Sequence, residues 1–204
     1  MTYLQGPHIQ LRALEPEDLE LMYTIENDTT LWDVSNRQVP YSREVLRQYI
    51  INSQADLYAD KQVRLMMELR DTQEIAGKQP TRETAGKQPT PDIAGKRPTR
   101  LTVGAIDLFN FEPLHRHAEV GICVLQAYQG KGYATEALQL LCDYAFRFLC
   151  LEQLVAHIAT ENTHSMQLFS SCGFTPCGTL KRWWNVEGSF KEVTLLQRLK
   201  KMNL

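Results

Sequence analysis

The chain has 204 residues, of which 43% are hydrophobic and 23% are charged, and its formal net charge is −2 at pH 7. These values are typical of a soluble globular domain, and they give no electrostatic basis for binding nucleic acid. The absence of any run of about 18 apolar residues excludes a membrane-spanning helix. No secretory signal is visible at the N-terminus, so we expect a cytoplasmic protein.

The N-terminal part of the chain predicts one strand followed by two helices. Residues 9–14 alternate between apolar and polar types, as in a half-buried strand. Pro16 and the acids beside it suit a helix start, and an apolar stripe continues to about Asn27. Ser42 can cap a second helix that runs to about Tyr58. We expect its apolar side to be formed by Val45, Leu46, Tyr49 and Ile50.

Residues 74–100 consist of three nine-residue units with glycine and proline at fixed positions and almost no apolar residues. Such a segment buries too little surface to offset its ordering entropy, so we predict disorder. Strand-like runs at 63–69 and 101–109 flank it, which predicts an insertion in a β-hairpin loop. Duplication of a short turn is the favoured origin, and a basic arm that binds a partner is the alternative.

The remainder of the chain predicts a mixed sheet with helices packed on it, in one domain over residues 1–204. Further strands are expected at 117–125, 153–159, 179–185 and 190–199, and helices at 134–148 and 163–172. A turn at Glu187-Gly188 joins the last two strands. The fold class is therefore α/β of the α+β type, with a mainly antiparallel central sheet flanked by helices.

A glycine-rich loop at residues 129–134 lies where a strand ends and a helix begins. Gly130 and Gly132 allow the backbone to approach a ligand closely, and the N–H groups of the helix start form an anion site suited to a pyrophosphate. Tyr133 stands where a nucleoside-triphosphate loop needs lysine, and Thr135 breaks the dinucleotide-binding pattern. If the loop is considered alone, a tight turn that binds no ligand is an alternative interpretation.

Together with its flanking strand, this loop resembles the acetyl-CoA motif of the GNAT superfamily of N-acetyltransferases. The motif Gln/Arg-x-x-Gly-x-Gly/Ala is filled by Gln129, Gly132 and Ala134. A second block, residues 162–165 with Gly173-Phe174, resembles the asparagine-led helix of the family. The similarity covers nearly the whole chain except residues 74–100. It is greatest to spermidine N-acetyltransferases and ribosomal-protein-alanine N-acetyltransferases.

The resemblance implies that acetyl-CoA is the co-substrate and that no metal is involved. The strand ending at Leu125 would splay from the next strand to admit the pantetheine arm, and the loop N–H groups would hold the pyrophosphate. The residues implied in acetyl-CoA binding are Cys123, Val124, Leu125, Gln129, Gly130, Lys131, Gly132, Tyr133, Ala134, Thr135, Asn162 and Ser165.

The candidate catalytic base is Glu119, acting through water, since an alkylamine is mostly protonated at pH 7. On an alternating strand it shares a face with Gly121 and Cys123, and His117 on that face is a weaker candidate. A salt-bridged surface position is the alternative for Glu119. Many family members carry a tyrosine as general acid seven residues after the motif asparagine, where this chain has Phe169.

The family binds its acceptor between the first two helices and the final strand pair, which makes Trp32, Glu44 and Trp184 candidate acceptor-binding residues. Residues 15–33 hold seven acids and no Lys or Arg, so they could attract a cationic amine or form a solvated helix face. The expected acceptor is the primary amine of a polyamine or another small cation. A protein or peptide N-terminus, or a non-catalytic acyl-CoA-binding module, are the alternatives. Each of these functions is compatible with a homo-oligomer.

Overall fold

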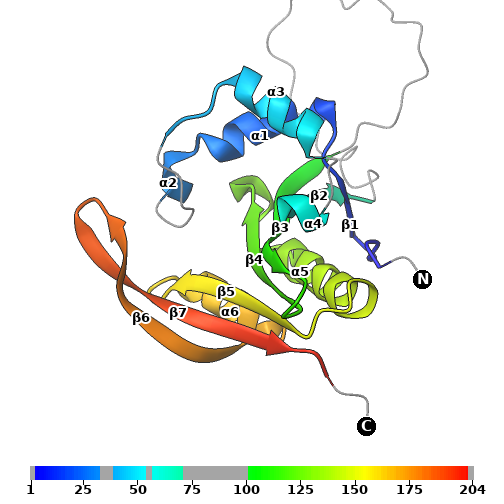
Figure 1. Cartoon of the computed structure of the whole chain (residues 1–204). Coiled ribbons are helices and arrows are strands. Elements are labelled where there is room, and N and C mark those ends of the chain that lie inside the picture. Colours follow the sequence, from blue (N-terminus) through cyan, green and yellow to red (C-terminus); the bar gives the residue numbers. More distant parts are fainter. Residues whose placement is uncertain (1–2, 33–38, 54–56, 71–100, 202–204) are drawn as a thin grey trace, which may run out of the picture.

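Seven strands form one mixed sheet in the computed structural model, which describes residues 3–32, 39–53, 57–70 and 101–201 (Figure 1). The strands are β1 Ile9–Ala13, β2 Val63–Leu69, β3 Thr102–Glu112, β4 His117–Val124, β5 Gln153–Ala159, β6 Thr175–Val186 and β7 Ser189–Leu199. Their order across the sheet is β1-β2-β3-β4-β5-β7-β6. In this described sheet β4 and β5 run parallel and the other neighbours are antiparallel, which confirms the predicted fold class. The predicted repeat at residues 74–100 lies outside the described residues.

Helices cover both faces of this sheet. They are α1 Leu19–Glu26, α2 Thr29–Trp32, α3 Arg43–Asn52, α4 Leu57–Asp60, α5 Tyr133–Asp143 and α6 Thr163–Ser171. Leu141 of α5 lies in the main core with Ile106 of β3. Met22 of α1 and Leu46 of α3 lie in a second core with Met66 of β2. Because side chains alternate along a strand, α5 covers one face of the sheet and α1 with α3 covers the other (Figure 1).

The second predicted helix is shorter and its apolar stripe narrower than expected. Ser42 caps α3 as predicted, since its Oγ accepts from the N–H of Val45 at 3.2 Å. The helix ends at Asn52 rather than near Tyr58, where the Ser53 hydroxyl donates to the carbonyl of Ile50 at 2.8 Å. Val45 is 51% exposed and not on the apolar side, because it precedes the buried Leu46 by one residue and so points about 100° away.

The helix after the glycine loop also departs from a regular apolar stripe at its end. Residues Tyr144–Phe148 continue α5 as a π-helical turn, in which the N–H of Leu149 donates to the carbonyl of Tyr144 at 3.0 Å. This wider turn changes the angular spacing of the side chains. Phe148, the last residue of the helix predicted at 134–148, is therefore 60% exposed, although an apolar residue at helical spacing was expected to face the core.

Buried arginines link the face under α1 to the sheet. Arg12 of β1 bonds Asp18 at 2.7 Å, and Arg64 of β2 bonds Glu26 of α1 at 2.6 Å. Exposed Glu20 pairs with Arg43 of α3 at 2.9 Å. Three of the seven acids within residues 15–33 therefore already have arginine partners. These ion pairs link the N-terminal helices to β1, β2 and α3, which is a structural role for these three acids.

The parallel pairing of β4 with β5 is short. It covers His117 to Glu119 of β4, and Glu119↔Val155 is its last pair. Beyond that point β4 continues beside β3 as far as Val124, and β5 continues beside β7 as far as Ala159. The two strands therefore separate towards their C-terminal ends, and the predicted splay is confirmed.

Gly104 of β3 provides a test of how tightly the strands beside this opening pack. A Cβ atom on Gly104 would lie 2.2 Å from the carbonyl oxygen of Cys123 on β4, and this backbone atom cannot move without loss of strand pairing. We predict that Gly104→Ala lowers the free energy of unfolding by about 1–3 kcal/mol, measured by chemical denaturation.

Gly178→Ala on β6 is the matched control, since its Cβ would lie 3.6 Å from Leu195 Cδ1, an ordinary contact. We expect it to change the free energy of unfolding by less than about 0.5 kcal/mol. Equal stability of the Gly104 variant and the parent chain would contradict the described β3–β4 pairing.

Candidate active site

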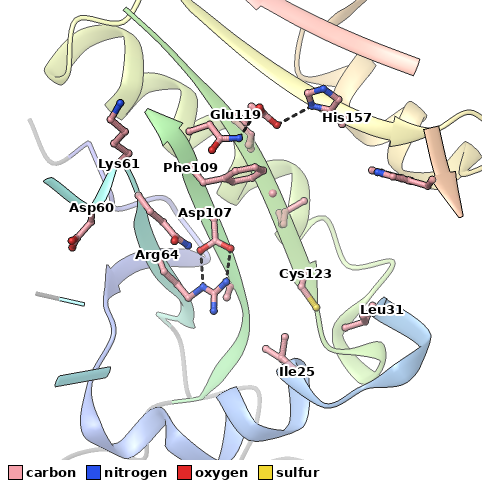
Figure 2. Close-up of a pocket in the computed structure, with 17 residues that line it drawn as sticks. Ile25, Leu31, Asp60, Lys61, Arg64, Asp107, Phe109, Glu119, Cys123 and His157 are labelled. Atoms are coloured by element: carbon pink, nitrogen blue, oxygen red, sulfur yellow. Dashed lines mark hydrogen bonds and ion pairs between the residues drawn. The ribbon is translucent and has the colours of Figure 1, made fainter. Parts of the chain in front are cut away.

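A cavity of about 700 Å³ opens on the α1 face of the sheet, beside the point where β4 and β5 separate (Figure 2). Ile25 of α1 and Leu31 of α2 border it on one side. The cavity-facing parts of β3 and β4 form its floor, and His157 of β5 and Trp184 of β6 line it from beyond the splay. Residues from both halves of the sheet therefore meet around one space.

Glu119 lies at the apex of the splay and lines this cavity. The side-chain amide of Asn110 donates to its Oε1 at 2.9 Å. Its Oε2 lies 2.8 Å from Nδ1 of His157, an ion-pair distance when the histidine is protonated (Figure 2). Glu119 keeps 23% of its side chain exposed, so the carboxylate is both fixed and open to the cavity.

The residues that follow Glu119 on the same face leave room above β4. Gly121 has no side chain, and a Cβ there would lie 3.3 Å from the ring of Phe109 on β3. Cys123 comes next and also lines the cavity. The predicted shared face of these three β4 residues is confirmed. It forms a low floor that starts at the carboxylate and follows the opening.

Arg64 and Asp107 form a largely buried ion pair in the floor of the cavity, with 11% and 17% of their side chains exposed (Figure 2). Arg64 Nε donates to Asp107 Oδ1 at 2.7 Å, and Arg64 Nη1 donates to Glu26 at 2.6 Å. Burial alone lowers the pKa of Arg64, but the charge and hydrogen bonds of Asp107 outweigh it and raise that pKa above its ordinary value. Arg64 is therefore a permanent cation that neutralises the acid beneath the cavity.

The glycine loop has the conformation that an anion site requires. Gly130 and Gly132 have φ of +73° and +83°, and Gly132 is the N-cap of α5. Among the described residues, and apart from the local backbone, no atom lies within 4 Å of the Cβ positions of these two glycines. The first turn of α5, which starts at Tyr133, has N–H groups without helical partners and the positive end of the helix dipole. Lys131 adds a cation, which lies 5.2 Å from the ring of Tyr128.

The end of β4 presents backbone groups alternately to β3 and to the opening. The N–H of Leu125 donates to the carbonyl of Val103 on β3 at 2.9 Å. Because antiparallel pairing alternates, Cys123 shares that direction and Val124 points its backbone groups into the splay. The Val124 carbonyl accepts from the side chain of Gln129 at 2.9 Å. Among the three residues predicted to contact pantetheine, Val124 is therefore the one whose backbone N–H and carbonyl face the splay, with the carbonyl accepting from Gln129.

The second motif block has clear structural roles in α6. Asn162 caps this helix, since its Oδ1 accepts from the N–H of Ser165 at 3.0 Å. That bond leaves the Asn162 amide N–H groups for a ligand. Phe169 is 3% exposed and packs edge-on against Phe174, with ring centroids 5.0 Å apart. Phe169 therefore belongs to the core and has no group that could protonate a thiolate.

The three candidate acceptor residues lie in different places. Trp184 lines the cavity. Trp32 donates its indole N–H to the carbonyl of Glu26 at 3.1 Å and does not line the cavity. Glu44 is exposed on α3, where it contacts Arg47 and accepts from Gln48 at 3.1 Å, away from the cavity lining.

Sequence reasoning missed two residues that contact the candidate base. Asn110 enters the site through a bulge in β3, which no local pattern indicates. His157 stands on β5, with buried Ala156 and Ile158 on either side, so alternation placed it on the cavity face. A polar residue there was a usable signal, but its partner on β4 depends on strand register.

Comparisons with known proteins assign the family. The family model described as "Acetyltransferase (GNAT) domain" matches residues 8–175. The chain therefore belongs to the GNAT family of acetyltransferases, as its motifs indicated.

In the described part of the chain, no helix combines the length and apolarity needed to cross a bilayer.

Among similar proteins, the spermidine N(1)-acetyltransferase of Escherichia coli (strain K12) is 27% identical over 183 residues, which cover 90% of this chain and 81% of that protein. The spermidine N(1)-acetyltransferase of Vibrio cholerae is 32% identical over 91 residues, 45% of this chain and only 53% of that relative. A crystal structure of Vibrio cholerae spermidine N-acetyltransferase in complex with CoA and spermine has a TM-score of 0.74 at 22% identity, covering 95% of this chain and 96% of that chain. This likeness shows the shared fold.

The glycine loop supplies a direct test of the cofactor site. We predict that Gly132→Glu weakens binding of CoA at least about 100-fold in calorimetry, because a carboxylate would occupy the space left for a pyrophosphate. A residue with a side chain at this positive φ also costs about 1–2 kcal/mol of stability.

Gly188→Glu separates these two effects. Gly188 has φ of +81° and equally open surroundings, but it lies in the β6–β7 turn. This control should lose similar stability and keep CoA affinity. Equal CoA affinity in both variants would exclude the loop as the pyrophosphate site.

Proposed function

We propose that the protein transfers an acetyl group from acetyl-CoA to the primary amine of a small cationic molecule, of the polyamine class, with Glu119 as general base. The observation that carries this proposal is the position of Glu119. Its carboxylate lies at the apex of the β4–β5 splay and faces a cavity large enough for an acceptor. Base, opening and cavity therefore coincide at one point.

The reaction is a direct transfer. Glu119 takes a proton through water from the ammonium group, and the neutral amine nitrogen then attacks the carbonyl carbon of the thioester. The nitrogen loses its second proton to water after the new carbon–nitrogen bond has formed. Collapse of the tetrahedral intermediate breaks the carbon–sulfur bond, and CoA leaves as a thiolate that takes a proton from water. No side chain need supply that proton, which agrees with the burial of Phe169.

The opening between the strands suits the pantetheine arm. The backbone of Val124 faces the splay, and residues Gln129 to Thr135 follow the end of β4 after one short 3-10 turn at Gln126–Tyr128. In this arrangement, the loop N–H groups with Lys131 hold the pyrophosphate, and the Asn162 amide bonds the pantetheine end. An extended arm between these points runs along β4 towards Glu119.

The charges around the cavity favour a cationic acceptor. Asp60, Asp107 and Glu119 line it, against the basic side chains of Lys61 and Arg64. Arg64 is neutralised by Asp107 and Glu26, and Lys61 pairs with Glu112 at 3.6 Å, so Glu119 and Asp60 remain to attract an ammonium group. Trp184 adds an aromatic surface against which an alkylamine can pack. The spermidine N(1)-acetyltransferases among its relatives support the same acceptor class.

Replacement of the base tests the mechanism. We predict that Glu119→Gln lowers kcat by about 100- to 10,000-fold in an assay of thiol release from acetyl-CoA, because the amide cannot accept the proton. The affinity for CoA should be unchanged, since the loop is intact. A variant with the kcat of the parent would leave Glu119 with only a structural role.

An amine panel tests the acceptor. We expect turnover with spermidine and spermine and little with peptides that have free N-termini, measured by the same thiol release. Turnover of peptides alone would replace the polyamine acceptor by an N-terminal amine. Tight CoA binding without turnover of any amine would instead identify a non-catalytic acyl-CoA-binding module.

A further inference from the structure

Glu119 is held from both sides by residues of the neighbouring strands. Asn110 on β3 donates to one carboxylate oxygen at 2.9 Å, and Nδ1 of His157 on β5 lies 2.8 Å from the other. All three side chains line the same cavity (Figure 2). Side chains from β3 and β5 thus contact the carboxylate of Glu119 on β4, at the point where the backbone pairing of β4 with β5 ends.

Asn110 reaches this position through an irregular backbone. Strict alternation along β3 would place Asn110 on the α5 face beside Leu108, and Phe111 on the cavity face. The register shifts between Phe109 and Glu112, and Asn110 adopts φ of +49°. Phe111 consequently enters the main core and Asn110 joins the cavity lining. A left-handed residue inside a strand is strained, and such bulges commonly redirect a side chain at an active site.

His157 reaches Glu119 from the other half of the sheet. It follows Val155, the last β5 residue paired with β4, by two positions, so it belongs to the stretch that has already separated. Its Nδ1 is buried and makes no aligned hydrogen bond within the described structure, although 28% of the side chain is exposed. A buried polar atom without an aligned partner is uncommon and calls for an explanation. The Glu119 carboxylate, whose Oε2 lies 2.8 Å from this nitrogen, provides that explanation.

We propose that Asn110 and His157 are positioning residues that hold the two carboxylate oxygens of Glu119 and aim the base at the acceptor amine. This inference rests on the proposed function, in which Glu119 takes the proton of that amine. Without backbone pairing beyond the apex, the direction of the carboxylate depends on these side chains. Neither residue exchanges a proton with the substrate.

The test compares kcat in variants of both residues. His157→Leu removes the ring nitrogens, whereas His157→Asn places an amide nitrogen where Nδ1 stood. Asn110→Gly removes the donor and accepts the positive φ without strain. In thiol release with spermidine, or with a peptide if that is the amine turned over, His157→Leu and Asn110→Gly should each lower kcat about 10- to 100-fold. KM for acetyl-CoA should stay within about twofold, and His157→Asn should recover most of the lost rate.

Cys150→Gly is the matched control for the backbone change. Cys150 has φ of +56° and is exposed before β5, away from the cavity lining. Both glycine variants should keep or raise the midpoint of thermal unfolding, but only Asn110→Gly should lose kcat. A fall in stability of Asn110→Gly with unchanged kcat would show a merely structural residue.

Repeating His157→Leu and Asn110→Gly in the Glu119→Gln background shows whether they act through Glu119. We expect each to change the residual kcat by less than about twofold there, because nothing remains to aim. Equal losses in both backgrounds would overturn the positioning role. If the single variant Glu119→Gln retained full turnover, the proposed role of Glu119 as base would be wrong. If only Glu119→Gln lost turnover, the base would stand and the positioning proposal would fall.

Discussion

The end of the parallel pairing between β4 and β5 is the constraint on which the rest of the site depends. Hydrogen bonding stops at Glu119↔Val155, and each strand then follows a different neighbour. Backbone groups at Val124 are left facing an opening, while alternate side chains of β4 border the cavity. Since α5 begins only a short loop after β4, its anion-binding end lies at the far end of the same strand. The point where this strand pairing ends thus relates the proposed cofactor site to the proposed base.

Because β4 and β5 are no longer paired beyond Glu119, other interactions must hold the two halves of the sheet and the helix α1 in place. On one face, α5 and β3 share the main core with residues of β5, so the two halves are joined below the opening. On the other face, Arg64 ties α1 to the sheet through Glu26 and Asp107. Removal of one partner from such a buried pair costs about 3–5 kcal/mol, so α1 is held firmly over the cavity. Three of the seven acids in residues 15–33 have arginine partners, Asp18 with Arg12, Glu20 with Arg43 and Glu26 with Arg64.

Much of the fold could be predicted because its patterns are local. The strands at residues 63–69 and 153–159 have the predicted bounds. Buried positions alternate along most of 153–159, whereas 63–69 is a short apolar run with four consecutive buried residues. The glycine loop lies between β4 and α5 as predicted, and the positive φ of residues 130 and 132 is a conformation that favours glycine. The end of α3 was not, since a serine hydroxyl that folds back on Ile50 leaves no periodic signal.

The neighbours of Glu119 could not be predicted for a different reason. Asn110 and His157 lie on strands that flank β4, and their contacts depend on register and on one bulge. A shift of one residue in either strand would turn these side chains to the opposite face. Phe169 shows the reverse case, since its sequence position marked the absence of a general acid and its burial in the core agrees with that absence.

The most direct measurement is a crystal structure of the protein with CoA and spermine bound together. We predict that pantetheine lies between β4 and β5, with its pyrophosphate on the residue 130–135 loop. The CoA sulfur and an amine of spermine should then meet within one water molecule of the Glu119 carboxylate. A CoA molecule bound outside the splay, or an amine that lies far from Glu119, would contradict the assignment of this cavity as the active site.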